Sequence, residues 1–344
     1  MLWFRKKDAE EAAGEKIDLF SEEATAGEKS DVLDEDTALT DLIGEEDVSF
    51  WHRIGAALWA RKKIVAVSLA AFLTLGQMLE VVVYGWVPTT IPTVTLKVGP
   101  NGEKLAEGTT FVSTLRDMMR EQLDSGWVLN DMWPFAGYRR KFQEGLSDYW
   151  GSWLFILNLD MARVGGKGRA DPRITATLRA VTGYSDSWLF PPAEWKLQGA
   201  VGNLDSYIAD MQKREIFFPR GNNLHEFMKM TSGMLSTGVG ELTEENDIGF
   251  LMGYKPFQRN QGLAYGVKLA LETVKVDLAD IIARKGGGPQ LDKAIKYLEQ
   301  ALAMSPWIVS NGEWGIKSDV STLANLLSNA QSLINDLADT LRNA

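Results

Sequence analysis

The sequence contains no cysteine and only two histidines, His52 and His225, among its 344 residues. Without cysteine the chain cannot form disulfides, thiolate nucleophiles, iron–sulfur clusters or cysteine-ligated zinc sites. Two histidines are too few for a histidine-rich metal centre, and we expect His225, two residues after the helix-capping Asn223, to be solvated or to join the cap. We therefore expect neither a metal site nor another cofactor.

A surplus of basic residues is also lacking. The formal charge is −10, but residues 1–50 alone hold 16 acidic and 5 basic residues, which leaves 30 acidic and 31 basic residues in the rest of the chain. A nearly neutral body has no excess positive charge with which to neutralise phosphates, so we expect no nucleic-acid partner. Residues 1–45 are charged and poor in aromatic residues, which predicts a disordered acidic tail.

One long apolar run is present. Residues 64–87 read IVAVSLAAFLTLGQMLEVVVYGWV, and Glu80 is their only charged residue. This is long enough for a helix that crosses a membrane. Because 63 residues precede the run and no small-residue cleavage site follows it, we predict a retained transmembrane helix rather than a signal peptide. By the positive-inside rule, four basic residues before the run place the N-terminus in the cytoplasm: Arg53, Arg61, Lys62 and Lys63.

Small and polar residues lie on one side of the predicted span. They are Ala66, Ala70, Thr74, Gln77, Glu80 and Tyr84. We expect this face to pack against a second transmembrane helix, from another copy or from a partner. The alternative is that Ala and Thr are filler and that Glu80 reaches the outer interface. The juxtamembrane segment, residues 46–63, has apolar residues at helical spacing and is either an interfacial helix or an extension of the span.

Beyond the span the pattern changes twice. Residues 88–109 predict an extended linker with a short strand or small hairpin around the turn sequence GPNG. Residues 110–344 have helical periodicity, which predicts an all-α bundle of paired helices rather than a solenoid, since no fixed repeat is present. The predicted helices run from Phe111 to Leu123, Phe135 to Ile156, Pro172 to Gly183, Trp195 to Met211, Leu224 to Leu235, Phe257 to Ala283, Leu291 to Leu302 and Val320 to Leu341.

No catalytic motif is found. The sequence has neither the G-x-S-x-G nucleophile elbow nor the phosphate-binding GxxxxGK[ST] loop. Pairs of carboxylates carry no information here because acidic residues are abundant. Four tryptophans in expected loops are more informative, since tryptophan beside polar residues is typical of sites for sugars or proteins: Trp127, Trp133, Trp188 and Trp314. The alternative is that they plug the ends of the bundle.

Three segments carry a resemblance. GWVLNDMWPF, the block DPRITATLRAVTGYSDSWLFPPAEWKLQGAVGNLDSYIADMQKREIFFPRGNNL, and PWIVSNGEWG follow one another within about residues 110–340. In this order they resemble the bacterial domain-of-unknown-function family 2333. The resemblance implies a single-pass protein of the bacterial inner membrane with a helical periplasmic region, and it supplies no catalytic residues.

The functional expectation is structural. We expect a non-catalytic, membrane-anchored scaffold or accessory subunit of an envelope assembly, with the lipid bilayer and other membrane or periplasmic proteins, or further copies of itself, as partners. The alternative is a periplasmic protein that binds or hydrolyses cell-wall glycan. A third interpretation is a sensor that links the periplasm to the cytoplasmic tail.

Overall fold

A computed structural model of the chain describes residues 62, 66–68, 71–72, 75, 92–130, 137–164, 169–187, 192–244, 254–306, 309–312 and 317–343. The chain divides into two compact units, Met1–Phe72 and Leu73–Ala344. Nearly all described residues belong to the second unit, and those from residue 92 onward form the helical body.

The described part of the body is helical apart from its connections and one very short hairpin. Its helices are α4 (Thr109–Asp124), α5 (Gly137–Ile156), the π-helix η2 (Leu157–Met161), α6 (Pro172–Tyr184), α7 (Ala193–Met211), α8 (Gly221–Glu244), α9 (Tyr254–Asp277), α10 (Ala279–Arg284), α11 (Gly288–Leu302) and α12 (Asp319–Asn343). The two-residue strands β1 (Arg163–Val164) and β2 (Arg169–Ala170) pair antiparallel. The prediction of an all-α fold is confirmed.

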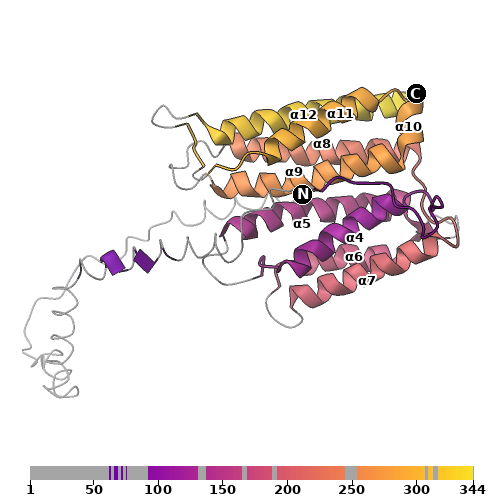
Figure 1. Cartoon of the computed structure of the whole chain (residues 1–344), viewed down its shortest axis with the longest axis horizontal. Coiled ribbons are helices and arrows are strands. Elements are labelled where there is room, and N and C mark those ends of the chain that lie inside the picture. Colours follow the sequence, from indigo (N-terminus) through magenta and orange to yellow (C-terminus); the bar gives the residue numbers. More distant parts are fainter. Residues whose placement is uncertain are drawn as a thin grey trace, which may run out of the picture. The chain divides into compact units, whose positions relative to one another are not determined.

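Helix α9 lies at the centre of the body. Figure 1 shows α4, α5, α6 and α7 on one side of α9 and α8, α11 and α12 on the other. Eighteen of the 24 residues of α9 are buried, whereas a surface helix buries a single stripe. Because helices cover α9 on several sides, it joins the two halves of the body into one core.

Helices α5 and α9 pack backbone to backbone. A Cβ atom at Gly262 would overlap the carbonyl oxygen of Phe142, and one at Gly145 would overlap the carbonyl oxygen of Arg259. Glycine is therefore needed on both helices for this close approach. Further along, Gly266 faces Tyr149, so the two helices run in the same direction and their N-termini lie at the same end of the body.

Aromatic side chains fill the core beside this crossing. The ring of Trp153 on α5 lies 4.9 Å from that of Phe111 on α4 and 5.7 Å from that of Phe227 on α8, centroid to centroid. Both pairs are edge-to-face, the geometry that aromatic quadrupoles favour. All three side chains are fully buried, so this cluster ties three helices together.

The chain before α4 is held by α9. The ammonium group of Lys268 donates to the carbonyl oxygen of Pro92 (3.0 Å), and the backbone N–H of Val94 donates to the carboxylate of Glu272 (3.0 Å). Lys268 and Glu272 also form an ion pair at 2.9 Å, with side chains only 2% and 9% exposed. Asp277, at the end of α9, accepts the N–H of Phe111 in the first turn of α4 (2.8 Å). These bonds fasten the linker to the core.

Local signals place most helix ends correctly. Asp171 caps α6 by accepting the N–H of Arg173, and Pro172 occupies the first turn as predicted. Ser318 accepts the N–H of Ser321 at the start of α12. In the linker, where a short strand or small hairpin is predicted, Val98 and Lys104 form one isolated antiparallel bridge.

Three local predictions are wrong. Asn223 does not cap α8, which begins at Gly221; its amide instead donates to the carbonyl oxygens of Asp160 and Phe218. His225 is buried because α12 covers it, and its Nδ1 lies 2.7 Å from the carbonyl oxygen of Ala338. The helix predicted from Phe257 to Ala283 is interrupted at Leu278, which separates α9 from α10.

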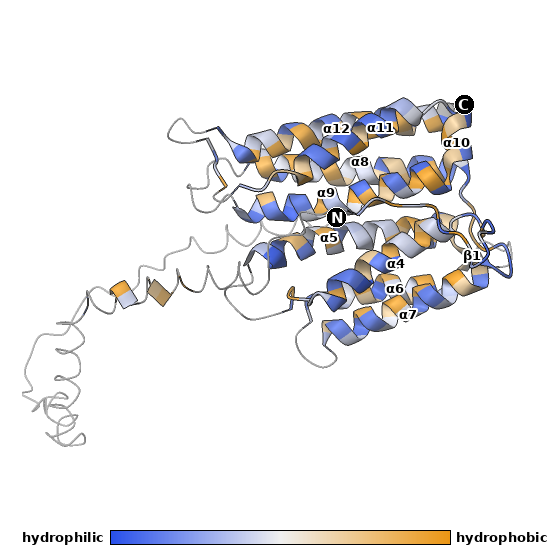
Figure 2. Cartoon of the chain, in the orientation of Figure 1, coloured by the Kyte–Doolittle hydropathy of each residue, from blue (hydrophilic) through white to orange (hydrophobic). Residues whose placement is uncertain are grey.

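The predicted span lies almost entirely outside the described residues. Within it, residues 66–68, 71–72 and 75 are helical, and the side chains of Val67, Phe72 and Leu75 are exposed. Among the described helices, none combines the length and the apolar composition that a membrane crossing requires. Figure 2 accordingly shows hydrophilic as well as hydrophobic residues along the helices of the body. The tail, residues 1–45, is outside the described residues, as is the juxtamembrane segment except for Lys62.

Candidate functional site

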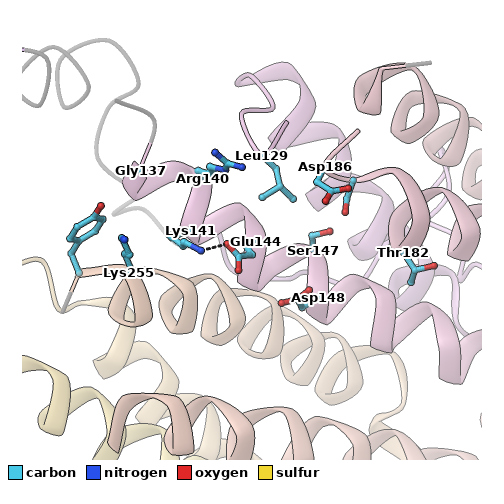
Figure 3. A pocket seen from close by; sticks show the side chains of 12 residues that line it. Leu129, Gly137, Arg140, Lys141, Glu144, Ser147, Asp148, Thr182, Asp186 and Lys255 are labelled. Atoms are coloured by element: carbon cyan, nitrogen blue, oxygen red, sulfur yellow. Dashed lines mark hydrogen bonds and ion pairs between the residues drawn. The ribbon is translucent and has the colours of Figure 1, made fainter. Parts of the chain in front are cut away.

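A polar cavity of about 540 Å³ opens where α5 and α9 begin and α6 ends. Figure 3 shows Lys141, Glu144, Ser147 and Asp148 along α5, with Thr182 and Asp186 on the far side. Helix α5 supplies half of the lining residues, because its polar residues recur at three- and four-residue spacing and therefore share one face. The lining residues are Leu129, Gly137, Arg140, Lys141, Glu144, Ser147, Asp148, Thr182, Ser185, Asp186, Tyr254 and Lys255.

A second cavity, of about 450 Å³, continues along α5. The two cavities share Ser147, Asp148, Thr182 and Ser185, so they form one depression that we call the α5 groove. The further part is more apolar, with lining from α5, α6 and α8 that includes Phe155, Leu178, Val181, Met230 and Met234. The groove thus has a charged end and an apolar end. This composition suits a ligand or peptide with both kinds of surface.

One guanidinium group pairs with two carboxylates of the groove and with a third outside its lining. Arg259 on α9 pairs with Asp148 (2.6 Å), with Glu144 (3.4 Å) and with Glu241 on α8. Glu144 also binds Lys141 at 2.5 Å. Since Arg259 holds all three carboxylates, they are oriented as a charge network that links α5, α8 and α9.

The pKa of the Asp148 carboxyl, in the groove, is raised. Burial raises the pKa of its carboxyl; Arg259 opposes this change, and the nearby carboxylates Glu144 and Glu241 add to it. A carboxyl with a raised pKa in a cleft has the character of a general acid. Here, however, its oxygen is engaged by Arg259, which favours a structural role.

Of the four predicted binding tryptophans, the structure describes Trp127 alone. Trp127 is buried, stacks on Trp150 at 5.8 Å and donates its indole N–H to the carbonyl oxygen of Ser185 (2.7 Å). The hypothesis that Trp127 is a surface contact is therefore wrong, and the side chain closes the end of the bundle instead. Trp133, Trp188 and Trp314 lie outside the described residues.

A different tryptophan is exposed. Trp195, which the periodicity placed on the buried face of its helix, is 63% exposed near the start of α7. Beside it, the ammonium group of Lys196 lies 5.2 Å from the ring centre of Tyr184. The residue was misplaced because the buried face of α7 follows Ala193, Leu197 and Leu204, and Trp195 lies on another side of the helix.

The residues predicted for the membrane segment stay untested. Ala66 is helical and exposed, as is the topology residue Lys62. The other members of both sets lie outside the described residues: Ala70, Thr74, Gln77, Glu80, Tyr84, Arg53, Arg61 and Lys63.

The sequence signal for the groove was present but ambiguous. Lys141, Glu144 and Asp148 follow one another at helical spacing, a pattern that also describes an ordinary solvated face. The groove exists because α6 and α9 flank that face, and no local pattern predicts this. Within the described ranges no cluster of three or more histidine, aspartate or glutamate residues could hold a metal ion.

The comparisons with known proteins identify a family but no function. A family model described as "Uncharacterized protein conserved in bacteria (DUF2333)" matches residues 53–248. The match contains the first two motif blocks of the predicted resemblance, which is confirmed, and ends before PWIVSNGEWG. Neither a curated protein nor a solved structure matches the chain.

Proposed function

We propose that this chain, which belongs to the bacterial family DUF2333, is a membrane-anchored, non-catalytic accessory subunit of an envelope assembly that binds a partner in its α5 groove. The groove itself carries the proposal, because it joins a charged end to an apolar end on one rigid face. The engagement of Glu144, Asp148 and Glu241 by Arg259 favours binding over acid–base chemistry.

Anchoring rests on the apolar run at 64–87. We place it across the bacterial inner membrane, with the acidic tail in the cytoplasm and the helical body in the periplasm. The exposed side chains of Val67, Phe72 and Leu75 agree with a helix that faces lipid. A phosphatase reporter that works only in the periplasm, fused after Ala344, should be active; an inactive fusion would reverse the orientation.

The span is proposed to pack against another transmembrane helix through its small and polar face. Replacing Ala70 and Glu80 together by leucine would close the small-residue seam and remove its carboxyl. The double variant should lose co-purification of a membrane partner or of a second copy. Unchanged complexes would contradict the packing face and leave the groove unaffected.

The groove is tested by filling it. Thr182 lines both cavities and is exposed on α6, so Thr182→Trp should occupy the groove without disturbing the core. Ala176→Trp, at another exposed site on α6 outside the groove, is the matched control. Cross-linking in intact bacteria should give a heavier species that Thr182→Trp loses and Ala176→Trp retains. Equal cross-linking of the two variants would contradict binding in the groove.

A second candidate function is recognition or hydrolysis of cell-wall glycan. The raised pKa of Asp148 beside a cavity rich in hydroxyl and carboxyl groups is the observation that favours it. The detergent-solubilised full chain would then be retained on purified peptidoglycan, and Asp148→Asn would abolish release of glycan fragments. Absence of retention would exclude this candidate.

A further inference from the structure

The linker has a defined direction along α9. Pro92 is bonded by Lys268, Val94 is bonded by Glu272, and Phe111 is bonded by Asp277, so the chain advances along α9 towards the C-terminus of that helix. The described linker therefore leads away from the opposite end of the body. That end holds the N-termini of α5 and α9, and we call it the approach end.

The remaining tether is short. Residues 88–91 separate Pro92 from Val87, where the predicted span ends, and this stretch covers at most about 17 Å when fully extended. From Tyr254 to Lys268, α9 rises about 21 Å. The stretch between the span and Pro92 is thus shorter than the part of α9 between Lys268 and the approach end. The approach end therefore has to stay near the bilayer. This step rests on the membrane anchoring proposed above.

The described surface of the approach end suits lipid headgroups. Trp195 is 63% and Tyr184 40% exposed, and Lys196 lies over the Tyr184 ring. Tryptophan, tyrosine and lysine are typical of membrane interfaces, where ring and charge meet apolar and polar layers. The opposite end also exposes apolar side chains, Leu96 and Val98. The direction of the linker, and not exposed apolar surface, therefore decides which end is assigned to the membrane.

Basic residues reinforce this assignment. The first turns of α5 and α9 contain no acidic residue, although the helix dipole favours acids there. Instead Arg140 and Lys255 stand near these two N-termini, which lie side by side with the rings of Tyr138 and Tyr254 4.7 Å apart. Positive charge at this end has the sign that the phosphates of a bilayer attract.

We propose that the approach end of the body rests on the adjacent leaflet of the membrane, with Trp195 and Tyr184 in the headgroup layer and Arg140 and Lys255 near lipid phosphates. The bilayer is then a binding partner of the folded body as well as the solvent of the span.

The absence of cysteine makes this testable in the full chain. Gln198→Cys and Lys213→Cys place a fluorescent label at exposed sites near the two ends of α7. In proteoliposomes of phosphatidylethanolamine and phosphatidylglycerol with a nitroxide on the headgroups, the label at 198 should be quenched several-fold more than the label at 213. Equal quenching, or stronger quenching at 213, would overturn the proposal.

Two further readouts separate the possible failures. Flotation of the proteoliposomes reports anchoring alone, so a chain that floats but shows equal quenching refutes the surface and retains the span. Adding Trp195→Ser to the Gln198→Cys chain should reduce quenching at 198, whereas Leu96→Ser, at the other end, should leave it unchanged. Undiminished quenching in the Trp195→Ser chain would show that this tryptophan does not contact the bilayer.

Discussion

The two sides of α5 have different surroundings in the folded protein: one is closely packed and the other borders an open groove. Towards α9, glycines at 145 and 262 bring two backbones into contact and leave no space. Towards α6, Ser147, Asp148 and Thr182 border an open groove. One helix therefore supplies stability with one face and a binding surface with the other. Substitutions should be costly on the covered side and mild on the open side.

The largest loss of stability is expected on α9, where a buried ion pair holds the linker. Glu272→Ala would leave the buried ammonium group of Lys268 without its carboxylate and the N–H of Val94 without an acceptor. Removing one partner of a buried ion pair costs about 3–5 kcal/mol. The free energy of unfolding of the full chain in detergent, measured by urea titration, would report this loss.

The same helix offers a control. Lys275 pairs with Asp292 at 2.7 Å, but both side chains are more than half exposed. Exposed ion pairs contribute about 0–1 kcal/mol, so Asp292→Ala should be nearly neutral. If Glu272→Ala and Asp292→Ala destabilise the protein equally, burial does not set the strength of these pairs.

Replacing glycine by alanine should lower stability at the helix crossing and raise it at an exposed site. Gly262→Ala would press a methyl group into the backbone of α5, and overpacking of this kind costs about 1–3 kcal/mol or more. Gly233→Ala, at an exposed site on α8 with open space around it, should stabilise by about 0.5–1 kcal/mol. Thermal unfolding of both variants would measure the difference, and equal shifts would contradict a close-packed crossing.

A smaller loss of stability is expected on replacing Trp127, which closes the end of the bundle. Trp127→Phe removes the hydrogen bond to Ser185 and should cost about 1 kcal/mol. Trp195→Phe, at an exposed site, should change stability by less than about 0.5 kcal/mol. A larger loss for Trp195 than for Trp127 in urea titrations would reverse the assignment of the two tryptophans.

The smallest effect concerns pH and the groove. Because the folded protein raises the pKa of Asp148, its folded state favours the protonated form. The contribution of Asp148 to the free energy of unfolding is thus greatest below its ordinary pKa of about 4. It is lost as pH rises through the raised pKa of the folded state. Asp148→Asn should remove this decrease in stability with rising pH, and it should change stability at pH 7 by less than about 1 kcal/mol. Urea titrations between pH 4 and 7 would check it, and an unchanged pH dependence would contradict the assignment.

Much of the fold was predictable because its signals are local. Asp171 before Pro172, Ser318 before an apolar stripe and the glycines after Lys285 each act through the backbone within one helical turn. The buried stripe of α4, from Phe111 to Met119, follows from helical periodicity alone. The motif order was also sufficient to predict the family.

The groove was not predictable for a physical reason. Its polar residues on α5 obey the same spacing as a solvated face, and only the positions of α6 and α9 turn that face into a cavity. The burial of Lys268, Glu272 and His225 likewise has no local signal. Charged and polar side chains are usually exposed, yet here neighbouring helices and the linker supply buried partners.

By itself the sequence determined most helix boundaries, the all-α fold class and the family, because caps, glycines and apolar stripes act over a few residues. Only the tertiary structure decided that α9 is covered on several sides, that α5 crosses it at glycines, and that Trp127 is buried while Trp195 is exposed. These outcomes depend on which helices meet. Such pairings arise from the packing of whole surfaces and leave no mark on the spacing within one helix.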